Sequence, residues 1–305
     1  MAVARVAIIA PGSMGAGVGA HLRAHGAEVY TCLAGRGTWS GARARTAGMT
    51  VVPDDVELVR SVDVFLSIVP PGAAVETAER IAAAMTRGGV TPVYAECNAI
   101  APETARAIDR TVAAAGATCV DAGIVGGPPR PGGAGPRVYA SGADTSGLVR
   151  LRDHGLDVRP IGPEIGQASA LKMCYAMWSK GSQALAVGLL VTAALAGVSD
   201  PLLAQFRESE PELLPSMERR LPGMPPKAYR WVAEMEEMAK TLRDSGLPDE
   251  TFMGAARVYQ MIADSPLGRE TTERRERGQT VQDIVETLAA WCAAPAAQGG
   301  GGASG

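Results

Sequence analysis

Residues 6–15 read Val6-Ala7-Ile8-Ile9-Ala10-Pro11-Gly12-Ser13-Met14-Gly15. The apolar, β-branched run predicts a buried strand, and the glycines after it predict a tight turn into a helix. This unit is typical of dinucleotide-binding domains, in which the helix N-terminus binds the pyrophosphate. Ala10 replaces the first glycine of the usual GxGxxG pattern, and glycines that serve packing alone are the alternative explanation. The residues expected to contact the cofactor are Gly12, Ser13, Met14 and Gly15.

The region after the second predicted strand favours a phosphorylated cofactor. NAD sites usually carry an acid about 20 residues beyond the glycine turn, which binds the ribose 2′-hydroxyl. Here no Asp or Glu lies between Glu28 and Asp54. Arg36 is the guanidinium best placed to bind a 2′-phosphate, whereas Arg43 and Arg45 equally fit a solvated basic helix. The sequence therefore favours NADP over NAD.

Residues 4–160 alternate short β-branched runs with helical stretches, which predicts βαβ units and a parallel sheet. Beyond about Gly166 the strand patterns stop, and apolar residues recur at helical spacing. We therefore expect an α/β protein: an N-terminal Rossmann-type parallel sheet in residues 1–165 and an all-α domain in residues 166–292, joined by a long interdomain helix. Residues 293–305, rich in Gly and Ala, are expected to be a disordered tail. The predicted strands are 5–9, 28–31, 62–68, 92–95, 118–120 and 137–140, and the predicted helices of the first domain are 14–24, 73–85, 102–114 and 146–154.

Composition argues against several classes of protein. A net charge of −3 provides no basic excess to neutralise a nucleic-acid backbone. The longest apolar stretch is too short to cross a bilayer, and the first residues lack the pattern of a signal peptide. Five scattered cysteines suit a reducing cytoplasm, and three histidines, two of them on one predicted helix, make a metal site unexpected.

A second informative segment, residues 166–175, places Lys172 inside an apolar helix. A lysine that acts as a general acid or base needs a pKa lowered towards the working pH, and burial provides this. Leu171, Met173, Cys174, Met177 and Trp178 are the apolar surroundings we expect. The alternative is a lysine whose stem packs on the core while its ammonium group reaches solvent.

Three residues beyond this lysine are candidates for substrate contact. On a regular α-helix, Tyr175 and Ser179 lie on or near the face of Lys172. Lys180 lies farther round the helix from Lys172. There its ammonium group suits the binding of a substrate carboxylate or phosphate, and exposure to solvent is an equal alternative. Glu234 and its neighbours Glu236 and Glu237 suit a substrate with an amine or several hydroxyls, although a solvated acidic face explains them better.

Two loops follow predicted strands at residues 67–71 and 96–100. Ligands collect at the carboxyl ends of strands in open α/β sheets. We therefore expect Val69 and Pro70 of the first loop and Asn98 of the second to contact the cofactor. For Asn98, a role in starting the next helix is an equal alternative.

These motifs, in this order, resemble the β-hydroxyacid dehydrogenase family, which includes 6-phosphogluconate and 3-hydroxyisobutyrate dehydrogenases. The family's glycine loop, roughly GxGxMG, is similar to residues 10–15. Its substrate loop, roughly DAPVSGG, is similar to residues 121–127, and its lysine segment, roughly GxxxxxKxxNN, to residues 166–176. The resemblance covers nearly the whole chain. It implies that Lys172 is the general acid/base, that Gly126 and Gly127 offer backbone N–H groups to the substrate, and that the protein is a homodimer.

The departures from the family pattern concern the substrate. Val125 stands in place of the substrate-binding serine, and Tyr175 and Ala176 replace the asparagines after the lysine. Tyr175 is therefore a candidate substitute hydrogen-bond donor. These features resemble a branch of phosphogluconate dehydrogenase-like proteins whose C-terminal domain is of unknown function, so the reaction class carries over and the substrate does not.

The sequence thus predicts an NADP-dependent oxidoreductase that transfers a hydride between nicotinamide and a 3-hydroxy acid or a related small polar alcohol or ketone. An imine reductase or reductive aminase, with a closely similar fold, is the first alternative. Lys172 argues against it, whereas Tyr175 fits it. A non-catalytic NADP(H)-binding sensor is the second alternative, because a fold alone does not fix a function.

Overall fold

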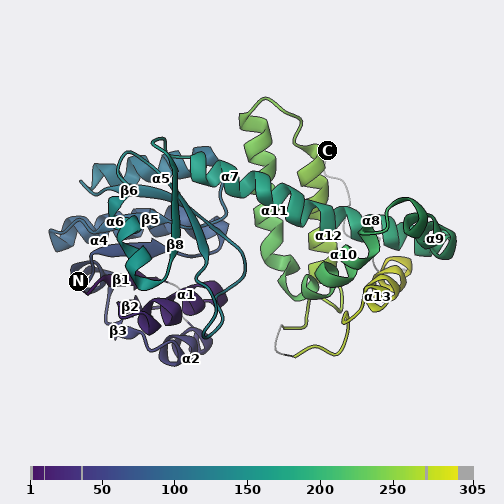
Figure 1. The fold of residues 1–305 in the computed structure, drawn as a ribbon, viewed down its shortest axis with the longest axis horizontal. Helices are drawn as coiled ribbons and strands as arrows, with labels where there is room; N and C mark the ends of the chain where they lie inside the picture. Colours follow the sequence, from purple (N-terminus) through teal and green to yellow (C-terminus); the bar gives the residue numbers. More distant parts are fainter. Residues whose placement is uncertain (1–2, 10, 36, 272–273, 295–305) are drawn as a thin grey trace, which may run out of the picture. The chain divides into compact units, whose positions relative to one another are not determined.

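The computed structural model describes residues 3–9, 11–35, 37–271 and 274–294 (Figure 1). The chain divides into two compact units, Met1–Cys174 and Tyr175–Gly305. It passes from one to the other inside helix α7 (Gln167–Ala176), whereas the sequence prediction began the second domain at residue 166. The predicted tail at residues 293–305 lies outside the described residues from residue 295 onward.

The first unit contains an eight-stranded sheet in the order β3-β2-β1-β4-β5-β6-β7-β8. Strands β1 to β6 pair in parallel, β7 is antiparallel to β6, and β8 is parallel to β7. This confirms the predicted Rossmann-type sheet. The order changes direction between β1 and β4, so their carboxyl ends flank the crevice at which doubly wound sheets bind ligands. The strands are β1 (Arg5–Ile8), β2 (Glu28–Cys32), β3 (Thr50–Val52), β4 (Val64–Ser67), β5 (Val93–Glu96), β6 (Cys119–Val125), β7 (Arg137–Ser141) and β8 (Asp157–Gly162).

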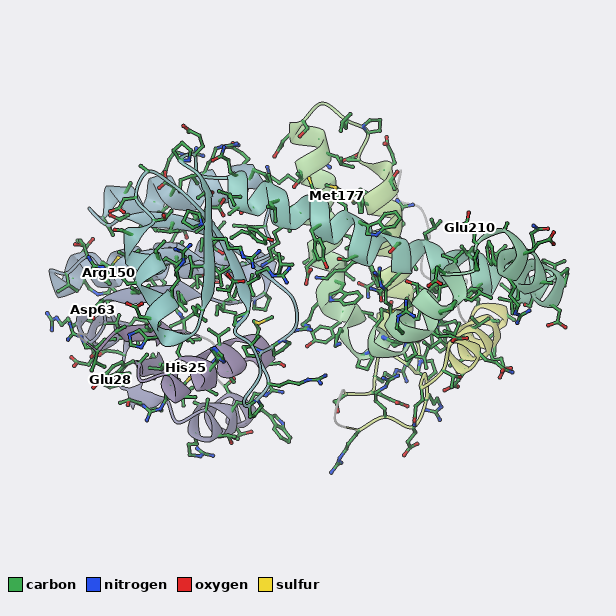
Figure 2. All side chains as sticks on the ribbon, in the orientation of Figure 1. His25, Glu28, Asp63, Arg150, Met177 and Glu210 are labelled. Carbon is green, nitrogen blue, oxygen red and sulfur yellow. The ribbon has the colours of Figure 1, made fainter. Side chains whose placement is uncertain are left out.

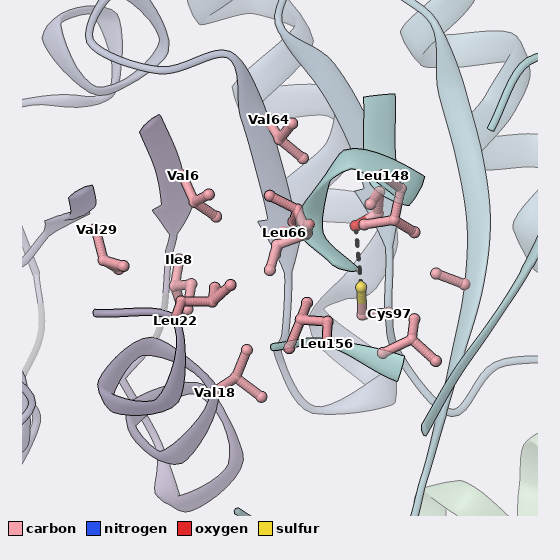
Figure 3. Packing of buried hydrophobic residues seen from close by; sticks show 14 of the residues in the cluster. Val6, Ile8, Val18, Leu22, Val29, Val64, Leu66, Cys97, Leu148 and Leu156 are labelled. Atoms are coloured by element: carbon pink, nitrogen blue, oxygen red, sulfur yellow. Dashed lines mark hydrogen bonds between the residues drawn. The ribbon is translucent and has the colours of Figure 1, made fainter. Parts of the chain in front are cut away.

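Helices cover both faces of this sheet, which explains why the central strands are apolar on both sides. Val6 and Ile8 of β1 pack with Val18 and Leu22 of α1 on one face (Figure 3). Ala7, between them in the strand, belongs to the core on the other face. The helices of the first face are α1 (Ser13–Ala24), α2 (Thr38–Thr46) and α6 (Ser146–Val149), and those of the second are α3 (Asp55–Arg60), α4 (Ala74–Gly88) and α5 (Pro102–Ala114).

The sequence missed the elements β3, α3 and β8, and it offered α2 only as an alternative, the basic helix around Arg43 and Arg45. β3 and α3 have only three and six residues, too few to show a period. Strand β8 is largely exposed at the edge of the sheet and contains Pro160, which is tolerated there because an edge strand needs fewer ladder hydrogen bonds. The helix predicted at residues 146–154 is α6 followed by a 3₁₀ segment, Arg150–His154.

The three histidines lie together at the end of α1. His21 Nε2 lies 2.9 Å from the Gly155 carbonyl oxygen, His25 Nδ1 lies 2.8 Å from the His21 oxygen, and His154 Nδ1 lies 2.9 Å from the His25 oxygen. The rings therefore tie α1 to the segment before β8. Within the described ranges, no three His, Cys, Asp or Glu side chains are placed to hold a metal ion.

The second unit is helical, as predicted. Residues 167–195 form one helical run, in which a π-helical segment, Met177–Gly181, separates α7 from α8 (Ser182–Leu195); Met177 is labelled in Figure 2. Of the helices in the described part of the chain, none has both the length and the hydropathy that a membrane span requires. The others are α9 (Ser199–Ser209), α10 (Leu213–Arg220), α11 (Ala228–Asp244), α12 (Glu250–Asp264) and α13 (Val281–Ala293).

Candidate active site

The glycine turn joins β1 to α1, as predicted. Gly12 is the N-cap of α1, with φ −69° and ψ −175°, and Ser13, Met14 and Gly15 form the first turn. Ala10 lies outside the described residues. Among the residues that are described, no side chain caps this N-terminus, and its first turn carries no acid. Its backbone N–H groups therefore suit an anion.

The environment of Gly12 fits a dinucleotide. Its φ is one that any residue adopts, so the backbone does not require glycine. A Cβ atom added at Gly12 would meet no atom of the described residues within 4 Å, so packing against that part of the chain does not require glycine either. The remaining reason for a glycine is space for a ligand that approaches the backbone, as a pyrophosphate does at this turn.

The predicted 2′-phosphate ligand, Arg36, lies outside the described residues. Arg43 and Arg45 lie in the last turn of α2. The role of Arg36 in the choice between NAD and NADP therefore stays a prediction.

Asn98 ties together the two loops that follow β4 and β5. Its Oδ1 accepts a hydrogen bond from the Val69 N–H (2.6 Å), and its Nδ2 donates to Ser67 Oγ (3.0 Å). Asn98 is buried, and Pro70 beside it is exposed. The contacts of Asn98 are those of a residue that shapes the crevice; direct contacts of Val69, Pro70 and Asn98 with the cofactor stay predictions.

Glu96 lies beneath these loops as the last residue of β5. Its Oε1 accepts a hydrogen bond from the Asn98 N–H (2.9 Å). Burial disfavours the charged carboxylate and raises the pKa of Glu96 to about 8, although hydrogen bonds from Asn98 and Ser67 and the nearby charge of Lys172 favour the charged form. Below that pH the Glu96 carboxyl group is mainly neutral.

The helix that carries Lys172 is anchored to the sheet by Asp121 of β6. One oxygen of Asp121 accepts hydrogen bonds from the Gly166 N–H (2.8 Å) and the Ser169 N–H (3.0 Å), and its other oxygen accepts one from Ser169 Oγ (2.6 Å). The hydroxyl of Ser141 on β7 donates to Asp121 (3.1 Å) and accepts from the Ala168 N–H (3.0 Å). These two strands thus supply the N-terminal cap of α7 and fix its position.

Lys172 lies at the carboxyl end of the sheet. Its Nζ donates a hydrogen bond to the Cys97 carbonyl oxygen, 3.1 Å away, in the loop that Asn98 organises. Gly123 of β6 permits this approach, because a Cβ there would lie 3.0 Å from the Ala168 oxygen and 3.2 Å from Lys172 Cβ. The half-buried Lys172 is therefore placed among the loops that surround the crevice.

The surroundings of Lys172 differ from those predicted. Met173 is fully buried, but Cys174 is exposed and Trp178 is 72% exposed. Exposed side chains such as Cys174 and Trp178 thus do not supply the buried apolar surroundings that the sequence predicted. Two polar groups, the Glu96 carboxyl group and the Cys97 carbonyl oxygen, form part of the surroundings of Lys172 instead.

The glycines of the substrate loop are exposed at the end of β6. A Cβ at Gly126 or Gly127 would meet no atom within 4 Å in the described part of the chain. The loop then turns back over α1: a Cβ at Gly17 would lie 3.1 Å from Pro129 and 3.2 Å from Pro128. Residues 126–129 are therefore held beside the first turns of the helix that begins at the glycine turn.

The prediction that a regular α-helix carries the candidate substrate residues is wrong beyond Ala176. The π-helical segment shifts the hydrogen-bond pattern to i→i+5, so the faces expected for Ser179 and Lys180 do not apply. Tyr175 is 56% exposed. Lys180 forms an ion pair with Glu234 and lies 5.1 Å from the centre of the Trp231 ring. In this structure Lys180 and Glu234 thus neutralise each other.

Sequence reasoning assigned no role to Glu96, Asp121 or the serines that bond to Asp121. The sequence does contain a feature that points to them. Ser67, Glu96 and Asp121 are polar residues within strands that are otherwise buried and apolar. A buried polar group needs a partner. Such a residue at the carboxyl end of a parallel strand is therefore a candidate for shaping a ligand site.

Comparison with known proteins agrees with this geometry. Residues 5–146 match the NAD binding domain of 6-phosphogluconate dehydrogenase, and residues 193–262 match a domain of unknown function (DUF1932). The conserved protein MTH1747, whose structure was described as similar to 3-hydroxyacid dehydrogenases, is 31% identical; the match covers 85% of this chain and 97% of that chain, with a TM-score of 0.64. The chain belongs to the β-hydroxyacid dehydrogenase family.

One further protein is similar in sequence, and one further solved structure is similar in fold. An uncharacterized 28.5 kDa protein from Methanothermus fervidus, named for its position in the 7S RNA 5′ region, is 27% identical over 60% of this chain and 68% of its own length. Mycobacterium tuberculosis 3-hydroxyisobutyrate dehydrogenase, solved with L-serine, shares the fold at 17% identity, with a TM-score of 0.67 over 95% of this chain and 99% of that chain. This β-hydroxyacid dehydrogenase family member is an NAD(P)-dependent, hydroxyacid dehydrogenase-like oxidoreductase.

Proposed function

We propose that the protein is an NADP-dependent dehydrogenase or reductase that acts on a 3-hydroxy acid or a related small polar alcohol or ketone. The observation that carries the proposal is the position of Lys172. Its helix is capped by Asp121 and Ser141, and its Nζ reaches the Cys97 carbonyl oxygen at the carboxyl end of the sheet. A sensor has no need of a lysine held this way.

Each residue group has one task in this proposal. The first turn of α1 holds the pyrophosphate, and Gly126 and Gly127 offer backbone N–H groups to the substrate's carboxylate or hydroxyl. Lys172 takes the proton from the substrate hydroxyl during oxidation and returns it to the carbonyl oxygen during reduction. The cofactor, when bound, accepts or supplies the hydride at its nicotinamide ring.

Tyr175, Ser179 and Lys180 stay substrate-contact candidates in the proposal. The ion pair between Lys180 and Glu234 implies that an anionic substrate group would have to compete with the glutamate for this lysine.

The described cysteines are all free, which fits our placement of the protein in the cytoplasm.

Titration with NADPH and NADH, followed by nicotinamide fluorescence, tests the cofactor assignment. We expect the wild type to bind NADPH more tightly than NADH. Gly12→Val should weaken binding of both nucleotides, because its side chain fills the space beside the first turn of α1. A Gly254→Val variant, at an exposed position on α12 of the helical unit, is the matched control. Equal affinity of the wild type and Gly12→Val would contradict the assignment.

We also propose a homodimer formed through the helical unit. Trp178 is exposed, and so are Leu185 and Leu195, which are 70% and 55% exposed. Large apolar side chains exposed along one helical run favour burial against a second copy. Light scattering should give twice the mass of the chain, and Leu185→Asp should shift it towards the monomer. Val75→Asp, on the first unit, is the control, and a wild-type monomer would contradict the proposal.

A further inference from the structure

A cavity of about 210 Å³ lies beyond the end of β2, within the first unit. It is formed by the backbone that follows β2 and by one face of α4. Its lining residues are Ala34, Gly35, Ala73, Glu76, Thr77 and Arg80. Neither the glycine turn nor Lys172 contributes to it.

The cavity lies where a dinucleotide's adenosine end is expected. β2 is the neighbour of β1 and runs parallel to it, so its carboxyl end lies at the same edge of the sheet as the glycine turn. In doubly wound folds the residues after β2 contact the adenosine ribose. Gly35, which lines the cavity, has φ +70°, and an added Cβ there would meet no atom of the described residues within 4 Å, so this part of the chain leaves the backbone open to a ligand.

α4 contributes two opposite charges to this cavity. Glu76 and Arg80 are four residues apart and thus lie on the same face of the helix. The Arg80 guanidinium forms an ion pair with Asp55 of α3, with Nε 3.1 Å from Oδ2. The Nε group is buried and has no aligned hydrogen bond among the described residues, and the arginine side chain is 39% exposed. One edge of the planar guanidinium is therefore anchored while its other N–H groups remain suited to a second anion.

We propose that Arg80 recognises the cofactor's 2′-phosphate, that Asp55 holds its guanidinium in place, and that Glu76 limits the affinity for that phosphate. The inference rests on the proposed use of NADP. A guanidinium binds a phosphate through paired, charge-assisted hydrogen bonds, whereas a carboxylate on the same helix face repels it. Cofactor preference is thus set partly by α4, in addition to the segment after β2.

Calorimetric titration of the purified full chain with 2′,5′-ADP and with 5′-ADP tests this inference without any substrate. We expect Arg80→Gln to weaken 2′,5′-ADP binding by about 10- to 100-fold, as the loss of charged hydrogen bonds does, and to change 5′-ADP binding by less than about threefold. Glu76→Gln should tighten 2′,5′-ADP binding several-fold. Arg87→Gln removes the same charge from the exposed end of α4 and should change neither affinity.

The outcomes separate this inference from the proposed function. An equal loss for both nucleotides in Arg80→Gln would show a contact with the adenosine alone and overturn the role of the phosphate. No loss for either nucleotide would also overturn it, while the dinucleotide site itself would stand. Failure of the wild type to bind either nucleotide would contradict the proposed function. If Arg80→Gln does not fold, unchanged 2′,5′-ADP affinity in Glu76→Gln would still overturn the inference.

Discussion

Replacement of Lys172 by alanine is expected to lower kcat/KM by about 10²- to 10⁴-fold, the usual loss when a general acid or base is removed. The affinity for NADPH should change by only a few-fold, because the residues assigned to the pyrophosphate lie on α1. The loss should appear mainly in kcat, since the proton transfer takes place in the transition state. Steady-state kinetics of the wild type and of Lys172→Ala, with cofactor binding measured in parallel, checks the expectation.

Lys240→Ala is the matched control for this experiment. Lys240 forms an exposed ion pair with Asp244, 2.6 Å away on α11, and its removal should leave kcat/KM nearly unchanged. Turnover by Lys172→Ala within a few-fold of wild type would remove the lysine from the mechanism. The anchoring of α7 by Asp121 does not involve the Lys172 side chain, so the variant should keep its fold.

Glu96→Gln is expected to make the protein more stable than the wild type, by an amount that grows with pH. The pKa of Glu96 is raised from its ordinary value of 4.5 to about 8. The unfolded chain therefore releases this proton at lower pH than the folded chain, so wild-type stability falls as the pH rises from about 4.5 to about 8. The glutamine imitates the neutral carboxyl group and removes this dependence. The difference in unfolding free energy should reach at most about 5 kcal/mol above pH 8.

Urea unfolding at several pH values between 5 and 9 measures this difference. The exposed residue Glu79, on α4, provides the control: Glu79→Gln should differ from the wild type by a small amount that does not change with pH. A constant difference between wild type and Glu96→Gln across the range would mean that Glu96 ionises normally. That result would also contradict the conclusion that a neutral Glu96 carboxyl group supports the loops after β4 and β5.

The sequence predicted the elements in which apolar residues recur clearly at strand or helix spacing and face the core. β1, α1 and α5 were placed within one or two residues of their observed bounds, because the cores on both sides of the sheet require apolar residues at these spacings. β3 and β8, short or exposed at the sheet edges, carry little of that signal. The π-helical segment after Ala176 was also missed, since the same residue types suit an α-helix.

The site was predictable where one residue acts alone and unpredictable where residues distant in sequence act together. Lys172 was identified from its own helix and from a family resemblance. Its support by Asp121, which lies far from it in the chain, depends on strand pairing that a local pattern does not contain. A local sequence pattern also does not predict that Arg80 and Gly35 line one cavity, because this depends on the packing of α4 on the sheet.

The measurement that tests the central claim most directly is turnover with a panel of substrates. Purified protein is mixed with NADP⁺ and 3-hydroxy acids, and with NADPH and the matching oxo acids or cyclic imines, while the absorbance of the reduced nicotinamide is followed. We predict oxidation of at least one 3-hydroxy acid or reduction of its oxo acid, with the activity lost in Lys172→Ala. Turnover of imines alone, or NADPH binding without turnover of any compound, would contradict the account.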